Sequence, residues 1–194
     1  MYDPIRSASF RKLGVADRAA FRDHLLRLDP EGRRCRFGGS TTDWFIENYA
    51  ERSVEDGTLI HGVFVGGRLV GCGELAIWDP ASGEAEAAFS VEARFRGFGF
   101  GTRLMRRVLL SARNRGVGTL RMTCLSANLP MQTLARRAGA DILFERGEAV
   151  ALLVTEGASP GSRVVEAVRD LRVRIESLFR LWSRPIHPGL GRSF

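Results

Sequence analysis

The stretch FRGFGFGTRLMRRVLLSARNRG, from Phe95 to Gly116, contains the feature that decides the fold. Its three glycines stand at alternate positions, Gly97, Gly99 and Gly101, directly before a run with apolar residues at helical spacing. Ordering a glycine costs conformational entropy, so such a cluster marks a tight turn or a place where another molecule approaches the backbone. The stretch therefore predicts either a tight turn that serves only to redirect the chain or a loop whose backbone contacts a ligand.

The ligand that suits this turn is a phosphate or a pyrophosphate. We expect a strand to end near Val91 and a helix to run from about Gly101 to Arg115. Unpaired backbone amides and the positive end of the helix dipole then meet at the loop and attract an anion. Three arginines add positive charge around it: Arg94, Arg96 and Arg103. A tight corner without a ligand is the alternative interpretation.

Two common phosphate-binding patterns are excluded by the residues themselves. A P-loop needs lysine after its last glycine, whereas Gly101 is followed by Thr102 and Arg103. The dinucleotide pattern GxGxxG needs a third glycine, and Thr102 or Leu104 stands in its place. If the loop binds a pyrophosphate, it belongs to a different class of site.

The rest of the chain predicts an α/β domain with a mixed sheet. A helix over about 17–28 is expected to be closed by Pro30 and Gly32, and a second helix follows a capping-box-like start at Ser40 and Asp43. Two strands joined at Gly66-Gly67 form a hairpin. The expected elements beyond it are strand 84–91, the glycine loop and its helix, strand 118–126, helix 128–139 and a strand pair around Arg146-Gly147.

Composition favours one folded domain with anionic partners. The chain has 194 residues, of which 44% are hydrophobic, and a formal net charge of +7. The only lysine is Lys12, and arginine suits bidentate phosphate contacts. Nucleic acid is a disfavoured partner, because the arginines are spread along the chain without interleaved aromatic residues. A genome-wide preference for arginine codons explains the composition equally well.

The cysteines and histidines argue against disulfides and metal ions. Cys35, Cys72 and Cys124 are far apart and odd in number, and no histidine pair has metal-ligand spacing. The start of the chain lacks a signal-like apolar core, and no apolar run approaches membrane-spanning length. We therefore expect a cytoplasmic protein without a metal and without a membrane span.

The C-terminal part differs in composition from the rest. EGASPGS is a linker of small residues, so we expect a domain over 1–156, followed by a linker, a basic amphipathic helix and a tail over 157–194. One apolar stripe runs along that helix, and it suits packing on its own domain or a homodimer contact. The stripe comprises Val164, Val168, Leu171, Ile175, Leu178 and Trp182.

Two motifs in the right order resemble the GNAT superfamily of acyl-CoA N-acyltransferases. The segment from Arg96 to Gly101 matches its R/Q-x-x-G-x-G/A signature, and NLPMQTLARRAGA resembles its second motif through Asn128, Met131, Leu134 and Gly139. The element order agrees over about 8–155. The resemblance implies the GNAT fold: a mixed, mostly antiparallel sheet with a splayed strand pair and helices on both faces.

Three further segments are similar to bacterial Pat-type protein lysine acetyltransferases. They are LDPEGRRCRF, AEAAFSV and LSANLPMQTLARRAGADI. This resemblance implies transfer of the acetyl group of acetyl-CoA to an amine, with a protein lysine side chain as the leading acceptor. A small-molecule amine is the near alternative, and a non-catalytic acyl-CoA sensor is an alternative of a different class.

The resemblance also implies which residues contact the cofactor. The pyrophosphate is expected on the loop amides, and the set is Arg96, Gly97, Phe98, Gly99, Phe100, Gly101 and Thr102. The pantetheine is expected along the strand edge, and the set is Phe89, Ser90, Val91, Asn128 and Met131. A backbone amide of that edge is expected to polarise the thioester carbonyl.

Glu86 is the predicted general base, acting directly or through water. Strand alternation places it on one face with Ala88 and Ser90, beside the expected cofactor cleft. Burial there would raise the pKa of its carboxyl, which suits a base, and similar Pat-type enzymes carry a functional glutamate in this AE position. The alternative is an ordinary carboxylate paired with an arginine. Glu74 on the preceding strand is the reserve candidate.

Two departures from the family pattern are visible. Many members have a tyrosine after the leucine of the second motif, proposed to protonate the leaving thiolate, whereas Ala135 stands here. A thiol with a pKa of about 8.5 leaves tolerably without help. Tyr49 could reach the cleft, although tyrosines on such helices usually serve in packing. Ala140 replaces an aromatic residue, which concerns packing only.

Overall fold

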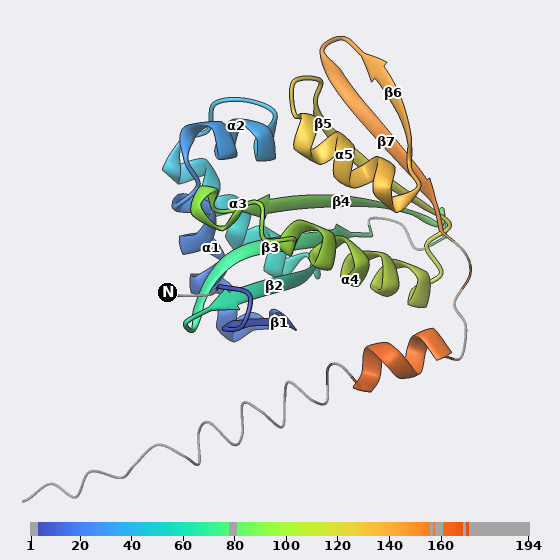
Figure 1. Cartoon of the computed structure of the whole chain (residues 1–194), viewed down its shortest axis with the longest axis horizontal. Helices are drawn as coiled ribbons and strands as arrows, with labels where there is room; N and C mark the ends of the chain where they lie inside the picture. The colour runs from blue at the N-terminus through green and yellow to red at the C-terminus, as the bar shows by residue number, and fades with distance from the viewer. Residues whose placement is uncertain (1–3, 78–80, 156, 158–160, 169, 171–194) are drawn as a thin grey trace, which may run out of the picture.

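The computed structural model describes residues 4–77, 81–155, 157, 161–168 and 170 (Figure 1). Five helices are named in it: α1 (Arg18–Leu26), α2 (Pro30–Phe37), α3 (Asp43–Glu55), α4 (Phe100–Asn114) and α5 (Leu129–Ala138). The strands are β1 (Ala8–Lys12), β2 (Leu59–Val65), β3 (Arg68–Ala76), β4 (Glu84–Val91), β5 (Thr119–Leu125), β6 (Asp141–Glu145) and β7 (Glu148–Val154). Single 3₁₀ turns lie at Val15–Asp17 and Ala93–Phe95.

The strands form one mixed sheet with the order β1-β2-β3-β4-β5-β7-β6. Every neighbouring pair is antiparallel except β4 and β5, which run parallel. That pair is joined only from Glu84↔Thr119 to Glu86↔Arg121, and beyond it the two strands separate. The β6–β7 hairpin accordingly stands away from the β1–β4 half (Figure 1). The predicted mixed sheet with a splayed strand pair is confirmed.

Helices cover both faces of the sheet, and each face has its own core. On one face α1 and α3 bury Phe21, Leu25 and Ile46 against β2 and β3. On the other face α4 and α5 pack over the strands around the splayed pair. The apolar residues of that core include Leu75, Ala87, Met105, Val108, Leu120, Met122 and Ala135. These two cores hold β4 between layers, so that its position is fixed from both sides.

The hairpin turns confirm the sequence prediction. Gly66 and Gly67 have φ of 60° and 82°, and Arg146 and Gly147 have φ of 47° and 88°. Two consecutive residues with positive φ form the turn that matches the twist of an antiparallel pair, and they favour glycine.

Three local predictions were wrong or incomplete. Pro30 does not close a helix but begins α2, because proline fits the first helical position, where its missing N–H has no partner to lose. Gly32 accordingly lies inside α2. The N-cap of α3 is Thr42, whose hydroxyl accepts from the Phe45 amide, and not Ser40. Strand β1 was not predicted.

The first turns of the C-terminal helix contact the domain through polar groups. Ser111 and Asn114 donate to the Glu166 carboxylate, and Lys12 Nζ lies 2.7 Å from it. Burial alone would raise the pKa of Glu166, but these hydrogen bonds outweigh it and lower the pKa to about 2. Within the described residues, every helix is too short or too polar to span a lipid bilayer.

The apolar stripe of this helix is only partly described. Val164 and Val168 are exposed, with 60% and 57% of their surface accessible. Leu171, Ile175, Leu178 and Trp182 lie outside the described residues. The domain boundary at 156 and the homodimer contact therefore stay predictions.

A buried histidine makes stability depend on pH. His61 lies under α4, with Nε2 2.9 Å from Ser111 Oγ, and burial lowers its pKa from 6.5 to about 3. Between these values the unfolded chain binds a proton that the folded chain does not, so the free energy of unfolding falls as pH decreases. One such proton contributes at most about 1.4 kcal/mol per pH unit.

We expect His61→Gln, which retains a donor for Ser111, to remove the contribution of His61 to the pH dependence of the free energy of unfolding. Chemical unfolding between about pH 4 and about pH 6.5, the range in which only the unfolded chain binds this proton, measures the slope. The buried His24, whose pKa burial also lowers, keeps its contribution in the variant. An unchanged slope in His61→Gln would contradict this account.

Candidate active site

The separation of β4 from β5 leaves one edge of β4 without a strand partner. The Glu92 amide donates to Val70 of the β3 side, at 3.0 Å. Because the backbone groups of successive residues alternate between the two edges of a strand, Ser90 also points toward β3, whereas Phe89 and Val91 point into the gap. Two of the three strand residues predicted to hold the pantetheine thus present backbone groups to the gap.

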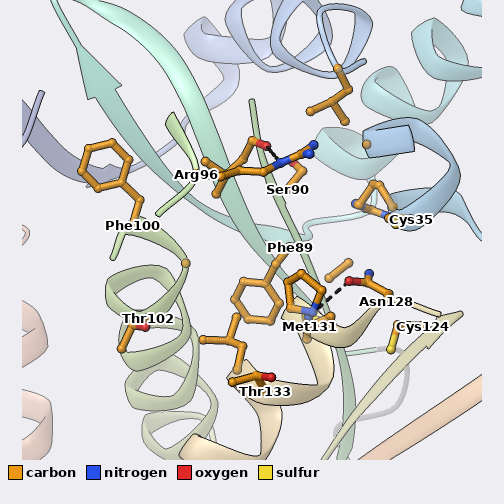
Figure 2. Close-up of a pocket in the computed structure, with 18 of the residues that line it drawn as sticks. Cys35, Phe89, Ser90, Arg96, Phe100, Thr102, Cys124, Asn128, Met131 and Thr133 are labelled. Carbon is orange, nitrogen blue, oxygen red and sulfur yellow. Dashed lines mark hydrogen bonds between the residues drawn. The ribbon is translucent and has the colours of Figure 1, made fainter. Parts of the chain in front are cut away.

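The gap forms a cavity of about 460 Å³. Figure 2 shows it between the start of α4, the start of α5, strand β4 and helix α2. All of the residues predicted to contact the cofactor line it except Phe98: Phe89, Ser90, Val91, Arg96, Gly97, Gly99, Phe100, Gly101, Thr102, Asn128 and Met131. Phe98 is 37% exposed and packs beside Phe100, with ring centroids 6.1 Å apart.

Two of the three loop glycines are required by the backbone. Gly97 and Gly99 have φ of 81° and 76°, and Gly99 is the N-cap of α4. A Cβ at either position would meet no heavy atom within 4 Å, so the space beside them is open. Gly101 has no positive φ, and a Cβ there would touch Leu134 at an ordinary 3.6 Å. The loop therefore delivers the N-terminus of a 15-residue helix to open space that suits an anion.

Arg96 is committed to protein contacts. Its Nε donates to the Val91 carbonyl at 3.1 Å, and its Nη2 donates to Asp29 Oδ1 at 2.8 Å. It thereby joins the end of β4 to the start of α2. A Cβ at Gly32 would lie 2.7 Å from Arg96 Nη2 and 2.5 Å from Asp29 Oδ1, so a side chain there would force the ends of these two side chains to shift. Helix α2 consequently lies close over the cavity.

The second motif supplies the opposite wall. Asn128 is the N-cap of α5, and its side-chain oxygen accepts from the Met131 amide at 3.2 Å (Figure 2). Met131 lines the cavity and packs against the core of that face. The cap fixes the start of α5 and with it the position of both residues.

A second cavity, of about 770 Å³, lies between α3 and the start of β4. Glu86 lines it and is half-buried; within the described part of the chain its carboxylate makes no ion pair or hydrogen bond. The pairing with an arginine, which was the alternative for this residue, is therefore not seen. The two cavities share Arg36 and Ala88 in their walls, so they meet at that point.

Glu74, the reserve base, is fully engaged. Its carboxylate accepts from Arg36 Nη2 at 2.7 Å and from the Tyr49 hydroxyl at 2.6 Å, and only 3% of the side chain is exposed. Burial, together with the Glu74 charge, raises the pKa of Tyr49. The arrangement favours Glu86 over Glu74 as the carboxylate available to a substrate.

Ser90 contacts a buried histidine. Its hydroxyl lies 2.9 Å from His24 Nε2, and His24 Nδ1 lies 3.4 Å from Glu92. Burial lowers the pKa of His24 despite the nearby carboxylate, so the ring is neutral near pH 7. This chain of contacts anchors β4 to α1.

The sequence missed the contribution of α2. Cys35 and Arg36 line the cofactor cavity; both lie in the segment LDPEGRRCRF that resembles Pat-type enzymes, but neither was predicted as a site residue. The proline that begins α2 was the available signal, and it was interpreted as a helix end. Among the described residues, no group of three or more His, Cys, Asp or Glu side chains could hold a metal ion.

The fold and the site together define an acyltransferase: a strand gap, a pyrophosphate-type loop at a helix start, and an adjoining cavity with a free carboxylate. Comparison with known proteins gives the family. The sequence profile of the acetyltransferase (GNAT) family matches residues 24–140, more than half of the chain, and the chain belongs to this family. Its activity is acetyl-CoA-dependent N-acetyl transfer. Comparison with curated protein sequences finds no match.

Solved structures share the fold. The GNAT domain of S. lividans PAT is 20% identical, with a TM-score of 0.65 over 76% of this chain and 90% of that one. The putative acetyltransferase yncA from Salmonella typhimurium, solved with acetyl-CoA, is 18% identical, with a TM-score of 0.59 over 79% and 98%. RimL, a ribosomal L7/L12 α-N-protein acetyltransferase solved with coenzyme A, is 11% identical, with a TM-score of 0.63 over 78% and 96%.

The loop geometry predicts the effect of one methyl group. Gly99→Ala places a side chain at positive φ, which costs about 1–2 kcal/mol and displaces the amides at the start of α4. We expect the affinity for acetyl-CoA, measured by calorimetry, to fall about tenfold or more. Gly116→Ala is the matched control, because Gly116 has φ of 74° and equally open space but follows the other end of α4. Equal affinity in both variants would contradict the assignment of the loop.

Proposed function

We propose that this chain transfers the acetyl group of acetyl-CoA to a lysine side chain of a protein, with Glu86 as the general base. One observation carries the proposal: two cavities meet at Ala88, one lined by the predicted cofactor residues and the other by an unpaired carboxylate. A direct transfer needs the thioester and the amine in contact, and the meeting point is where molecules in the two cavities would touch.

The cofactor's place in the first cavity is argued from its polar groups. The amides from Gly97 to Gly101 and the helix dipole suit the pyrophosphate, with Arg96, Phe98 and Thr102 shaping the loop. The gap-facing backbone groups of Phe89 and Val91 suit the amides of the pantetheine, with Ser90, Asn128 and Met131 as further contacts. By the same alternation the Phe89 amide faces the gap next to Ala88, where it can polarise the thioester carbonyl.

The chemistry follows from the acceptor's charge. A lysine side chain has a pKa of about 10.4 and is protonated near pH 7, so it must lose a proton before it attacks. Glu86 accepts that proton directly or through water. The neutral nitrogen then adds to the thioester carbonyl carbon, and the tetrahedral intermediate releases the thiolate of CoA. Ala135 offers no acid for that thiolate.

Two observations bear on the identity of the acceptor. Trp44 and Phe45 line the second cavity and are 71% and 43% exposed, which suits contact with a protein surface. The resemblance to Pat-type enzymes and the fold shared with S. lividans PAT support a protein lysine. The volume of about 770 Å³ exceeds what one lysine needs and lies in the range of small-molecule sites, so a small-molecule amine is the second candidate.

Glu86→Gln tests the base. We expect kcat to fall about 10²- to 10⁴-fold while the affinity for acetyl-CoA is retained, because Glu86 lies outside the cofactor cavity. The wild-type kcat/KM should rise with pH until Glu86 and the amine are both deprotonated. In Glu86→Gln, the part of this pH profile in which kcat/KM rises because Glu86 loses its proton should be absent. A panel of lysine peptides and small amines serves as the acceptors.

Glu84→Gln is the control, because Glu84 is exposed on the same face of β4 and lines neither of the two cavities. It should behave as wild type. If Glu86→Gln retained full turnover, another group would have to be the base. If acetyl-CoA bound but no acceptor were acetylated by the wild type, the acyl-CoA sensor would be the better description.

A further inference from the structure

A buried guanidinium stands where the two cavities meet. Arg36 and Ala88 are the residues that line both, and only 7% of the Arg36 side chain is exposed. Helix α2 carries Arg36 over the splayed end of β4, with Arg96 and Asp29 joining the start of that helix to the loop. A charge at this place is close to the atoms that react in any direct transfer between the cavities.

The orientation of this guanidinium is fixed by several contacts. Nε and Nη2 donate to Glu74 at 3.2 and 2.7 Å, and Nη2 also donates to the Tyr49 hydroxyl. The group lies 4.9 Å from the Phe37 ring centre and 5.0 Å from that of Tyr49. In the described part of the chain, Nη1 has no hydrogen-bond partner. One end of the guanidinium is therefore held while the other has donors to spare.

We propose that Arg36 is a catalytic residue whose Nη1 donates a hydrogen bond to the sulfur of CoA as it leaves. This role rests on the proposed acetyl transfer. The amine nitrogen forms a bond to the carbonyl carbon, the C–S bond breaks, and sulfur departs with the electron pair as a thiolate. The amine proton goes to Glu86, and Arg36 keeps its own protons.

Charge arguments favour stabilisation of the thiolate over its protonation. Burial alone would lower the pKa of Arg36, but the Glu74 carboxylate outweighs this and raises it, so the group stays charged. A charged donor to an anion makes a short, strong hydrogen bond, and its effect grows in a site shielded from water. Arg36 would thus supply from α2 what a tyrosine at position 135 would have supplied from α5.

Glu74 and Tyr49 are positioning residues in this arrangement. They hold Nε and Nη2, so their contacts decide where Nη1 can point. Glu74 also lowers the free-energy cost of burying the charge of Arg36, since only 7% of the Arg36 side chain and 3% of the Glu74 side chain are exposed. Removing Arg36 alone would leave the Glu74 carboxylate buried without a counter-charge, and the test must avoid that outcome.

The test measures the pKa of the thiol of bound CoA. The ultraviolet absorbance of the thiolate is recorded while the pH is raised. We expect the bound thiol in the wild type to titrate about one pH unit or more below free CoA, since a cationic donor favours the thiolate. Arg36→Gln combined with Glu74→Gln keeps the pair neutral and folded, and should return the thiol to the value of free CoA. Arg36→Lys should retain part of the shift.

Arg136→Gln is the charge-matched control. Arg136 is exposed on α5 and lines neither cavity, so its loss should leave the thiol pKa as in the wild type. In turnover, the double variant should lose about 10²-fold in kcat with little change in the affinity for acetyl-CoA.

The outcomes separate this role from the proposed function. A bound thiol that titrates alike in the wild type and in the double variant overturns the role of Arg36, while acetyl transfer with Glu86 as base still stands. A shift that Arg136→Gln also removes overturns it too, because the shift then comes from the net charge of the protein and not from a hydrogen bond of Arg36. Failure of the wild type to bind CoA overturns both proposals.

Discussion

The site depends on how briefly β4 and β5 pair. Their parallel ladder lasts from Glu84 to Glu86, after which the strands part while β4 stays fully paired with β3. An unpaired strand edge inside a protein needs hydrogen-bond partners, and a ligand with amide groups can provide them. The same divergence opens the cofactor cavity and places the glycine loop at its end. The unpaired edge of β4 therefore lies in the cofactor cavity, where a bound ligand can supply the hydrogen bonds that β5 does not.

Helix α2 turns this open gap into an enclosed site. It is held at its start by Asp29, which accepts from Arg96, and near its end by Arg36, which pairs with Glu74. The first contact joins it to the pyrophosphate-type loop and the second to β3. Gly32 leaves room for the Asp29–Arg96 pair, since a side chain there would force the ends of these two side chains to shift. Binding of the cofactor and the geometry of the acceptor side are thus linked through one short helix.

The sequence predicted what is local and missed what is long-range. The glycine loop and the hairpin turns each depend on residues a few positions apart, and each was predicted at the right place. Strand alternation predicted that Glu86 and Ala88 share a face of β4, and both line the second cavity, where Glu86 is half-buried and unpaired rather than deeply buried. The Arg36–Glu74–Tyr49 cluster joins residues 38 and 25 positions apart, and no spacing rule reports such contacts. The mistaken end at Pro30 hid the helix that carries Arg36.

Three carboxylates line the second cavity, and two of them, Glu74 and Glu86, lie on β3 and β4 in very different surroundings. Glu74 accepts two hydrogen bonds from a buried guanidinium and one from a phenol, so its carboxylate oxygens are already occupied. Glu86 has none to break in the described residues and stands half-open to the cavity where an amine would enter. A group that must gain and lose a proton in each turnover is best left without competing partners, whereas a group that holds a cation in place needs them. The unpaired carboxylate therefore suits the proposed role of the base, and the paired one holds the Arg36 guanidinium, which lines both cavities.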